Sequence, residues 1–240
     1  MSFLLRTMLI NNWKNVAKSD AARKAGLKLT PGVTADKDLP YLDDGHPLHL
    51  LDIWYPQETT GLLPCVIDIH GGGWMYGDKN LNDLFCASLA AQGYAVVTMS
   101  YRLMPETDLR GMLQDVFASL HWLAKHGQEH HCDLSRVYLT GDSAGGHLCG
   151  LTTCVQLNPA LQRVYGVHPA DFDIKAIAIN HGVCDLYSFG FMKGIPGWLI
   201  DREMHLLMFG SKRTKSEVFR SASFKDTARG LKLPPVMVIS

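Results

Sequence analysis

The sequence predicts an α/β domain whose mostly parallel central sheet has helices on both faces. Two nearly continuous apolar runs, at 63–70 and 94–101, suit strands that are buried on both sides, and residues 174–180 predict a further strand. Between them, apolar residues recur at helical spacing over 81–89 and over 112–123. Strands that alternate with helices of ordinary length indicate βαβ units, and 240 residues suffice for one such domain.

Composition narrows the class of protein. The 23 basic residues equal the 23 acidic ones, which argues against nucleic acid as the main partner. No apolar run is long enough to cross a bilayer, so we expect no membrane insertion. Arg6 interrupts the apolar N-terminus and no cleavage site follows, which predicts a cytoplasmic protein. The six cysteines lack metal-ligand spacing, so we expect free thiols, no metal and no cofactor.

The chain divides into four expected segments. Residues 1–45 form an N-terminal arm or cap segment, beginning with an amphipathic helix that Pro31 and Gly32 close. Residues 46–184 form the core, with further strands at 48–55 and 136–139. Residues 185–226 are an insertion rich in aromatics and methionine, interpreted as a small cap lining an apolar pocket, with plain helix packing on the sheet as the alternative. Residues 227–240 carry the last core strand present.

The stretch 139–146, Leu-Thr-Gly-Asp-Ser-Ala-Gly-Gly, has the pattern G-x-S-x-G between an expected strand and an expected helix. Such a sharp turn needs small residues two positions either side of Ser143. It exposes the serine oxygen at a helix N-terminus, where free N–H groups point at whatever binds. This pattern predicts that Ser143 is a nucleophile.

The second motif, His70-Gly-Gly-Gly, ends a buried strand. Glycines let the backbone approach a bound group, and N–H donors at a developing oxyanion supply a large part of acyl-transfer catalysis. We assign the oxyanion hole to the N–H groups of Gly72, Gly73 and Ala144. A phosphate-binding loop is the competing interpretation, but the lysine and spacing that it requires are absent.

Three motifs in order, at 70–74 (His-Gly-Gly-Gly-Trp), 101–106 (Tyr-Arg-Leu-Met-Pro-Glu) and 141–146 (Gly-Asp-Ser-Ala-Gly-Gly), resemble the hormone-sensitive-lipase branch of the α/β-hydrolases, also called bacterial family IV esterases. The resemblance covers residues 45–185 and 233–240. It implies an α/β-hydrolase fold with Ser143 as nucleophile. It also implies supporting roles for Arg102, Glu106 and Asp115.

The sequence departs from this family in its acid and base. In the family the order is serine, acid, histidine, and the acid follows a strand that 235–240 resembles. The chain stops on that strand, so we expect the acid, the histidine and the C-terminal strand and helix to be missing. Asp185 is the one alternative acid, while His70 and Asp142 are candidate supports of the site. The histidines at 147, 181 and 205 are interpreted as structural or surface residues.

These observations predict a serine carboxylic-ester hydrolase for a small-molecule ester, impaired as the 240-residue form. An amidase would share the same chemistry. The alternative is a non-catalytic ligand-binding protein on the same scaffold, which would keep the pocket without a base. An unpaired sheet edge predicts marginal stability or edge-to-edge pairing. The expected macromolecular partner is therefore a second copy of the chain or a complementing C-terminal polypeptide.

Overall fold

A computed structural model describes residues 2–188, 190, 195–211 and 216–240. Its seven strands form one sheet in the order β1-β2-β4-β3-β5-β6-β7, in which the first two pairings are antiparallel and all others are parallel. The strands are Val33–Pro40 (β1), Leu50–Pro56 (β2), Leu63–Ile69 (β3), Ala95–Met99 (β4), Cys132–Asp142 (β5), Ile174–Asn180 (β6) and Val236–Ile239 (β7). The predicted α/β class with a mostly parallel sheet is confirmed.

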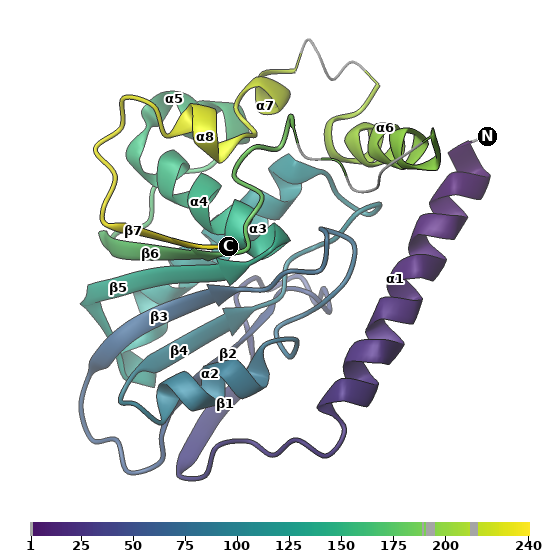
Figure 1. Cartoon of the computed structure of the whole chain (residues 1–240). Coiled ribbons are helices and arrows are strands. Elements are labelled where there is room, and N and C mark those ends of the chain that lie inside the picture. The colour runs from purple at the N-terminus through teal and green to yellow at the C-terminus, as the bar shows by residue number, and fades with distance from the viewer. Residues whose placement is uncertain (1, 189, 191–194, 212–215) are drawn as a thin grey trace.

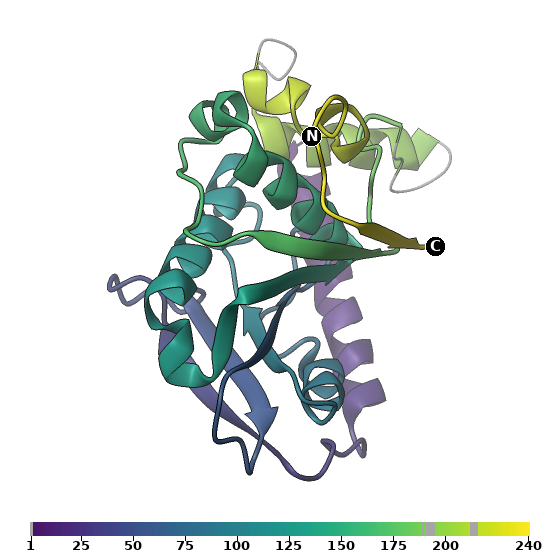
Figure 2. The same cartoon turned by 90° about the vertical axis from the view of Figure 1, so that its left-hand side faces the viewer.

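Helices connect these strands and cover both faces of the sheet (Figures 1 and 2). They are Ser2–Lys24 (α1), Asp83–Ala90 (α2), Leu109–His126 (α3), Ala144–Leu157 (α4), Pro159–Tyr165 (α5), Ile195–Phe209 (α6), Glu217–Arg220 (α7) and Phe224–Thr227 (α8), with a 3₁₀ turn at Gly127–His130 (η1). None of the helices in the described ranges is long and apolar enough to cross a membrane.

The two faces of the sheet are buried to different degrees. Alternate strand residues such as Ile67, Val97 and Leu139 join α3 and α4 in one large apolar core. The opposite face carries a smaller cluster, in which Val66 and Val96 pack against α2. Because strand side chains alternate between faces, one sheet supplies both cores.

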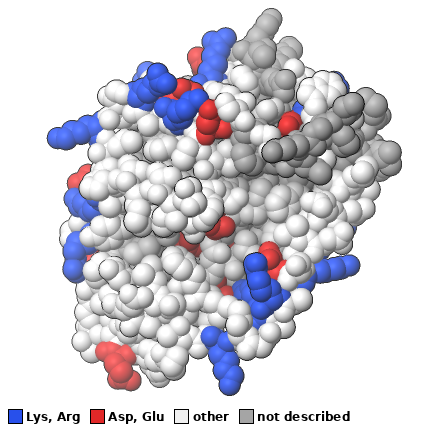
Figure 3. All heavy atoms as spheres, viewed as in Figure 1, with Lys and Arg blue, Asp and Glu red and all other residues white. Residues whose placement is uncertain are grey.

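On the α2 side, a groove of about 520 Å³ runs over β5, β6 and β7. It is lined mostly by apolar side chains, among them Phe85, Tyr138 and Met237. Every residue of β7 is exposed, and this strand forms one edge of the sheet (Figure 2). Charged side chains are sparse over the middle of the face that Figure 3 shows. In the described part of the chain, β7 therefore leaves one edge of the sheet unpaired.

Residues 33–40, assigned from sequence to the N-terminal arm, form β1, an edge strand paired with β2. Asp36, Lys37 and Asp38 give this strand a polar composition, and a register shift between Asp36 and Leu39 interrupts the pairing. A half-exposed edge strand needs no apolar run, so the hydrophobic pattern missed it.

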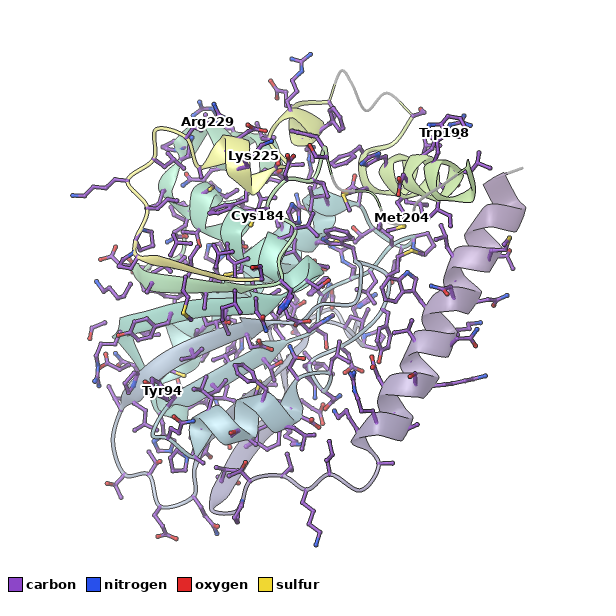
Figure 4. The ribbon with its side chains drawn as sticks, in the orientation of Figure 1. Tyr94, Cys184, Trp198, Met204, Lys225 and Arg229 are labelled. Carbon is purple, nitrogen blue, oxygen red and sulfur yellow. The ribbon has the colours of Figure 1, made fainter. Side chains whose placement is uncertain are left out.

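Helices α1 and α6 contact one another beside the carboxyl ends of the parallel strands (Figure 1). On α6, Met204 faces the body of the protein and is buried, whereas Trp198 points away and is 62% exposed (Figure 4). Helices α7 and α8 instead pack on α5 and α4. The segment 185–226, predicted to be a cap, thus has one part near the strand ends and another that packs on core helices. Its residues 189, 191–194 and 212–215 lie outside the described ranges.

Candidate active site

Ser143 occupies the turn between β5 and α4, where it is the residue that precedes the helix. Its backbone has φ 52° and ψ −115°, a strained conformation for a residue with a side chain. Two backbone hydrogen bonds hold it there: Ser143 N–H donates to Asn180 O at 2.9 Å, and His147 N–H donates to Ser143 O at 3.0 Å. The fold therefore imposes the sharp turn that the G-x-S-x-G pattern predicts.

The flanking glycines are required because the turn lies against neighbouring backbone. A Cβ on Gly145 would lie 1.9 Å from Ile69 O and 2.5 Å from His70 O. A Cβ on Gly141 would lie 2.5 Å from Gly145 O. Backbone carbonyl oxygens held in a strand, a helix and the loop between them cannot move aside like a flexible side chain, so only glycine fits at these positions.

The glycine loop begins where β3 ends, and the pairing of Ile69 with Gly141 brings it beside the elbow. Gly72 and Gly73 have φ values of 99° and 60°, which favour glycine. Gly71 N–H donates to Asp142 Oδ1 at 3.0 Å. Within the described ranges, by contrast, the N–H groups of Gly72, Gly73 and Ala144 donate to no protein acceptor. These are the three donors that the sequence assigned to an oxyanion hole.

His70 lies beneath this loop. Its Nδ1 lies 2.8 Å from Gly71 O, and its ring stacks on Tyr101 with 4.3 Å between the centroids. The Tyr101 hydroxyl donates to His70 O at 2.8 Å. Burial lowers the pKa of His70, so the ring is neutral and serves as packing for the loop.

Trp13 of α1 covers the loop from the other side, a contact that the sequence did not reveal. A Cβ on Gly73 would lie 2.1 Å from the Trp13 ring, so the indole sits directly over the Gly73 α-carbon. Trp13 also stacks on Tyr76 at 6.1 Å. Further along α1, Lys24 pairs with Asp83 at 2.7 Å. These contacts dock α1 against the glycine loop and the segment that follows it.

Asp142, next to Ser143, connects the turn at 141–145 to the glycine loop and to Asn82. Its Oδ1 accepts hydrogen bonds from Gly71 N–H and, at 2.9 Å, from Asn82 Nδ2. The same Asn82 nitrogen donates to Oδ2 of the buried Asp68 at 3.0 Å. Burial raises the pKa of Asp68 to about 7, with the nearby Asp142 adding to the rise. The sequence singled out Asp142 but not Asn82 or Asp68.

The supports implied by the resemblance lie in a separate network. Asp115 is buried and accepts from Arg102 Nε at 2.9 Å and from Arg102 Nη2 at 2.6 Å. The hydrogen bond with Asp115 raises the pKa of Arg102. Glu106 Oε1 lies 2.7 Å from His46 Nε2. None of these side chains hydrogen-bonds to Ser143 in the described part of the chain.

The side chains considered as acid and base have other partners. Asp185 forms an ion pair with Lys225, whose hydrogen bond lowers the pKa of Asp185 to about 2. His147 is buried, with Nε2 2.7 Å from Ala222 O, and burial lowers its pKa to about 4. His181 Nδ1 lies 2.7 Å from Asn180 Oδ1. His205 packs on α6 against Phe209.

With this geometry in place, comparison with known proteins gives the lineage. A family model named BD-FAE matches residues 51–227. The chain belongs to the BD-FAE family. It is 30% identical over 187 residues to the probable carboxylic ester hydrolase LipM of Mycobacterium tuberculosis, covering 75% of this chain and 43% of that protein. It is 42% identical over 96 residues to Lipase 2 of a Moraxella species, covering 40% of this chain and 22% of that one. The chain thus spans less than half the length of these two relatives.

Solved structures agree with the BD-FAE assignment. Esterase B from Lactobacillus rhamnosis superposes with a TM-score of 0.92 at 36% identity, covering 99% of this chain and 74% of that one. A bacterial heroin esterase superposes at a TM-score of 0.70 and 24% identity, which shows the shared fold. The predicted α/β-hydrolase fold and its esterase resemblance are therefore confirmed.

Proposed function

We propose that this BD-FAE protein is a carboxylic-ester hydrolase acting through an acyl-enzyme on Ser143. The observation that carries the proposal is the strained Ser143 turn beside three N–H groups, of Gly72, Gly73 and Ala144, that have no protein acceptor in the described residues. A serine oxygen beside free N–H donors suits the formation and stabilisation of a tetrahedral oxyanion.

In the proposed reaction, Ser143 Oγ bonds to the ester carbonyl carbon, and the carbonyl π electrons move to its oxygen. The three N–H groups stabilise that oxyanion. When the tetrahedral intermediate collapses, the C–O bond breaks and the alcohol leaves with a proton, giving an acyl-enzyme. Water then attacks the acyl carbon and releases the carboxylic acid and free Ser143.

The serine needs a base to take its proton. His147 is a poor candidate because its Nε2 is held by Ala222 O and its pKa is lowered to about 4. Within the described ranges, no histidine hydrogen-bonds to the Ser143 hydroxyl. Acylation and deacylation both need that base, so we propose that hydrolysis by the 240-residue chain is slow. An activated ester with a good leaving group, such as a p-nitrophenyl ester, should still acylate Ser143 faster than water hydrolyses the acyl-enzyme.

The substrate proposed is a small ester with a short or medium acyl chain or an aromatic group. Relatives named as carboxylic ester hydrolases and lipases support the ester bond. A solved structure of esterase B, which is 36% identical to this chain, contains a tributyrin phosphonate, and this supports a short acyl chain. Helices α1 and α6 contact one another beside the strand ends (Figure 1) and carry buried apolar side chains such as Leu9 and Met204, which supports an apolar group on the substrate.

The test is release of p-nitrophenolate from p-nitrophenyl butyrate by the wild-type chain, by Ser143→Ala and by Ser88→Ala, a control serine exposed on α2. We expect a stoichiometric burst and slow turnover in wild type and in Ser88→Ala. We expect the burst to vanish in Ser143→Ala, because loss of a serine nucleophile costs about 10⁴-fold or more.

Equal release by wild type and Ser143→Ala would contradict the nucleophile assignment. Turnover near the enzyme median of about 10 s⁻¹ would contradict slow hydrolysis. Saturable binding of the ester without any release would instead support the ligand-binding alternative, which the lack of a partnered base favours.

A further inference from the structure

Asn82 stands at the position that precedes helix α2, where asparagine normally caps the helix by accepting a backbone N–H. Here its side chain makes no capping hydrogen bond. It points instead toward the core, where Nδ2 donates to Asp68 Oδ2 at 3.0 Å and to Asp142 Oδ1 at 2.9 Å. The Asn82 side chain thus bridges two carboxylates instead of capping α2. Helix stability alone does not explain this arrangement.

The bridge leads directly to the oxyanion loop. Asp142 Oδ1 accepts from both Asn82 and Gly71 N–H, so one oxygen ties α2 to the start of the glycine loop. The contact is tight, since a Cβ on Gly71 would lie 2.4 Å from Asp142 Oδ2. Asp142 also directly precedes Ser143, so its side chain fixes the loop relative to the nucleophile.

The second carboxylate explains why an amide is needed. Asp68 is 2% exposed. Its Oδ2 accepts hydrogen bonds from Asn82 Nδ2 and, at 3.9 Å, from the Cys86 thiol. Two neighbouring carboxylates repel each other when both are ionised. The Asn82 amide supplies N–H donors to both, and so holds Asp142 toward Gly71 rather than letting it turn to solvent.

We propose that Asn82 is a positioning residue of the oxyanion hole, acting through Asp142 on the Gly71–Gly73 backbone. The proposal rests on the function proposed above. Loss of a direct oxyanion donor costs about 10²–10³-fold in rate, and loss of a support for such donors costs less. We expect about a tenfold loss of the acylation rate when the bridge is removed.

The probe is an alkyl p-nitrophenyl phosphonate ester. Ser143 Oγ bonds to phosphorus, p-nitrophenolate leaves, and the hydroxyl proton passes to base or solvent. Because the phosphonylated serine is stable, each protein molecule releases one p-nitrophenolate. Wild type, Asn82→Ser and Asn82→Ala are compared. Serine caps helices and alanine does not, so the two variants share only the lost amide. Asn80→Ser, at an exposed position two residues away, is the matched control.

We expect the limiting rate constant of labelling to fall about tenfold in both Asn82 variants, with under twofold change in the inhibitor concentration at half-maximal rate. The melting temperature should fall more in Asn82→Ala than in Asn82→Ser. A merely structural role would instead lower the labelled fraction and make rates follow melting temperature. Asn80→Ser should match wild type.

A double-mutant cycle tests the route through Asp142. If Asn82 acts through that carboxylate, Asn82→Ser should change the labelling rate less than twofold in an Asp142→Asn background. Full additivity, or unchanged labelling in both single Asn82 variants, would overturn the inference. Failure of the proposed function is distinguishable, because wild type itself would then not be labelled at Ser143 by mass spectrometry.

Discussion

The side of the proposed site that carries Ser143 and the side on which an acid and a base were sought differ in how firmly their residues are held. Around Ser143, backbone hydrogen bonds, glycine contacts and the Asp142 carboxylate fix each group. At the opposite side, Asp185 is paired with Lys225 and every residue of β7 is exposed. The contrast teaches that the Ser143 turn and the glycine loop are held by backbone contacts and the Asp142 carboxylate, and that Asp185 takes no part in holding them.

Gly145→Ala should have the largest effect, because it disrupts the turn that holds Ser143. The new Cβ would lie 1.9 Å from Ile69 O, so the elbow or strand β3 must shift. We expect a loss of unfolding free energy of at least about 3 kcal/mol and no phosphonate labelling. Gly61→Ala, where a Cβ meets nothing within 4 Å, should change stability by under about 0.5 kcal/mol. Urea unfolding measures both, and equal stability of the two variants would refute the steric argument.

Asp68→Asn should change how stability depends on pH. Burial raises the pKa of Asp68 to about 7, whereas the unfolded chain ionises it near 3.9. The folded state then holds a proton that the unfolded state has lost, so stability falls as pH rises from about 4 to about 7. Between pH 5 and pH 8 we expect this to cost wild type about 3 kcal/mol.

Urea unfolding of wild type and Asp68→Asn at pH 5 and pH 8 measures this difference. The variant should lack the decline, while Asp173→Asn, whose side chain is 84% exposed, should retain it. An identical pH dependence in wild type and Asp68→Asn would show that Asp68 does not hold the proton.

Asp185→Asn tests the less constrained half. Replacing a triad aspartate by asparagine lowers rates by about 10⁴-fold. Because Asp185 is paired with Lys225, we expect labelling of Ser143 to stay within about twofold of wild type. A fall in the labelling rate near 10⁴-fold would show that Asp185 acts as the acid of the site. The two sides of the site would then not differ in the way described above.

Met237→Lys tests the open edge and should have the smallest effect on stability. Met237 is 56% exposed on β7 and lines the apolar groove. We expect unfolding free energy to change by under about 0.5 kcal/mol. We predict that copies of the wild-type chain pair through β7, and we expect that pairing to weaken in the variant, because a lysine on an edge strand opposes strand pairing. Sedimentation velocity over a range of concentrations measures this, and unchanged association would place the contact elsewhere.

The parts of the fold that sequence could predict are those where one local requirement dominates. The run 94–101 contains β4, all five of whose residues are buried, because a strand covered on both faces must be mostly apolar. The elbow was found because its backbone leaves no room for side chains beside Ser143. The hydrophobic pattern did not predict strand β1, because an edge strand tolerates polar residues such as Asp36 and Lys37.

The site residues that sequence missed have ordinary local explanations. Asn82 precedes a helix, where asparagine is common for capping, so nothing in the sequence distinguishes a bridge from a cap. Asp68 lies within an apolar run, and a lone buried carboxylate there was the one available hint. Their contacts join residues 14 and 60 positions apart, which only the tertiary structure brings together.

Because Trp13 lies over Gly73, the docking of α1 is coupled to the conformation of the glycine loop. Linkage is reciprocal: a ligand that shifts Gly73 when it binds changes how tightly α1 docks, and loosening α1 changes the affinity for that ligand by the same factor. The Trp13 indole, stacked on Tyr76, therefore offers a built-in fluorescent reporter of events at the glycine loop.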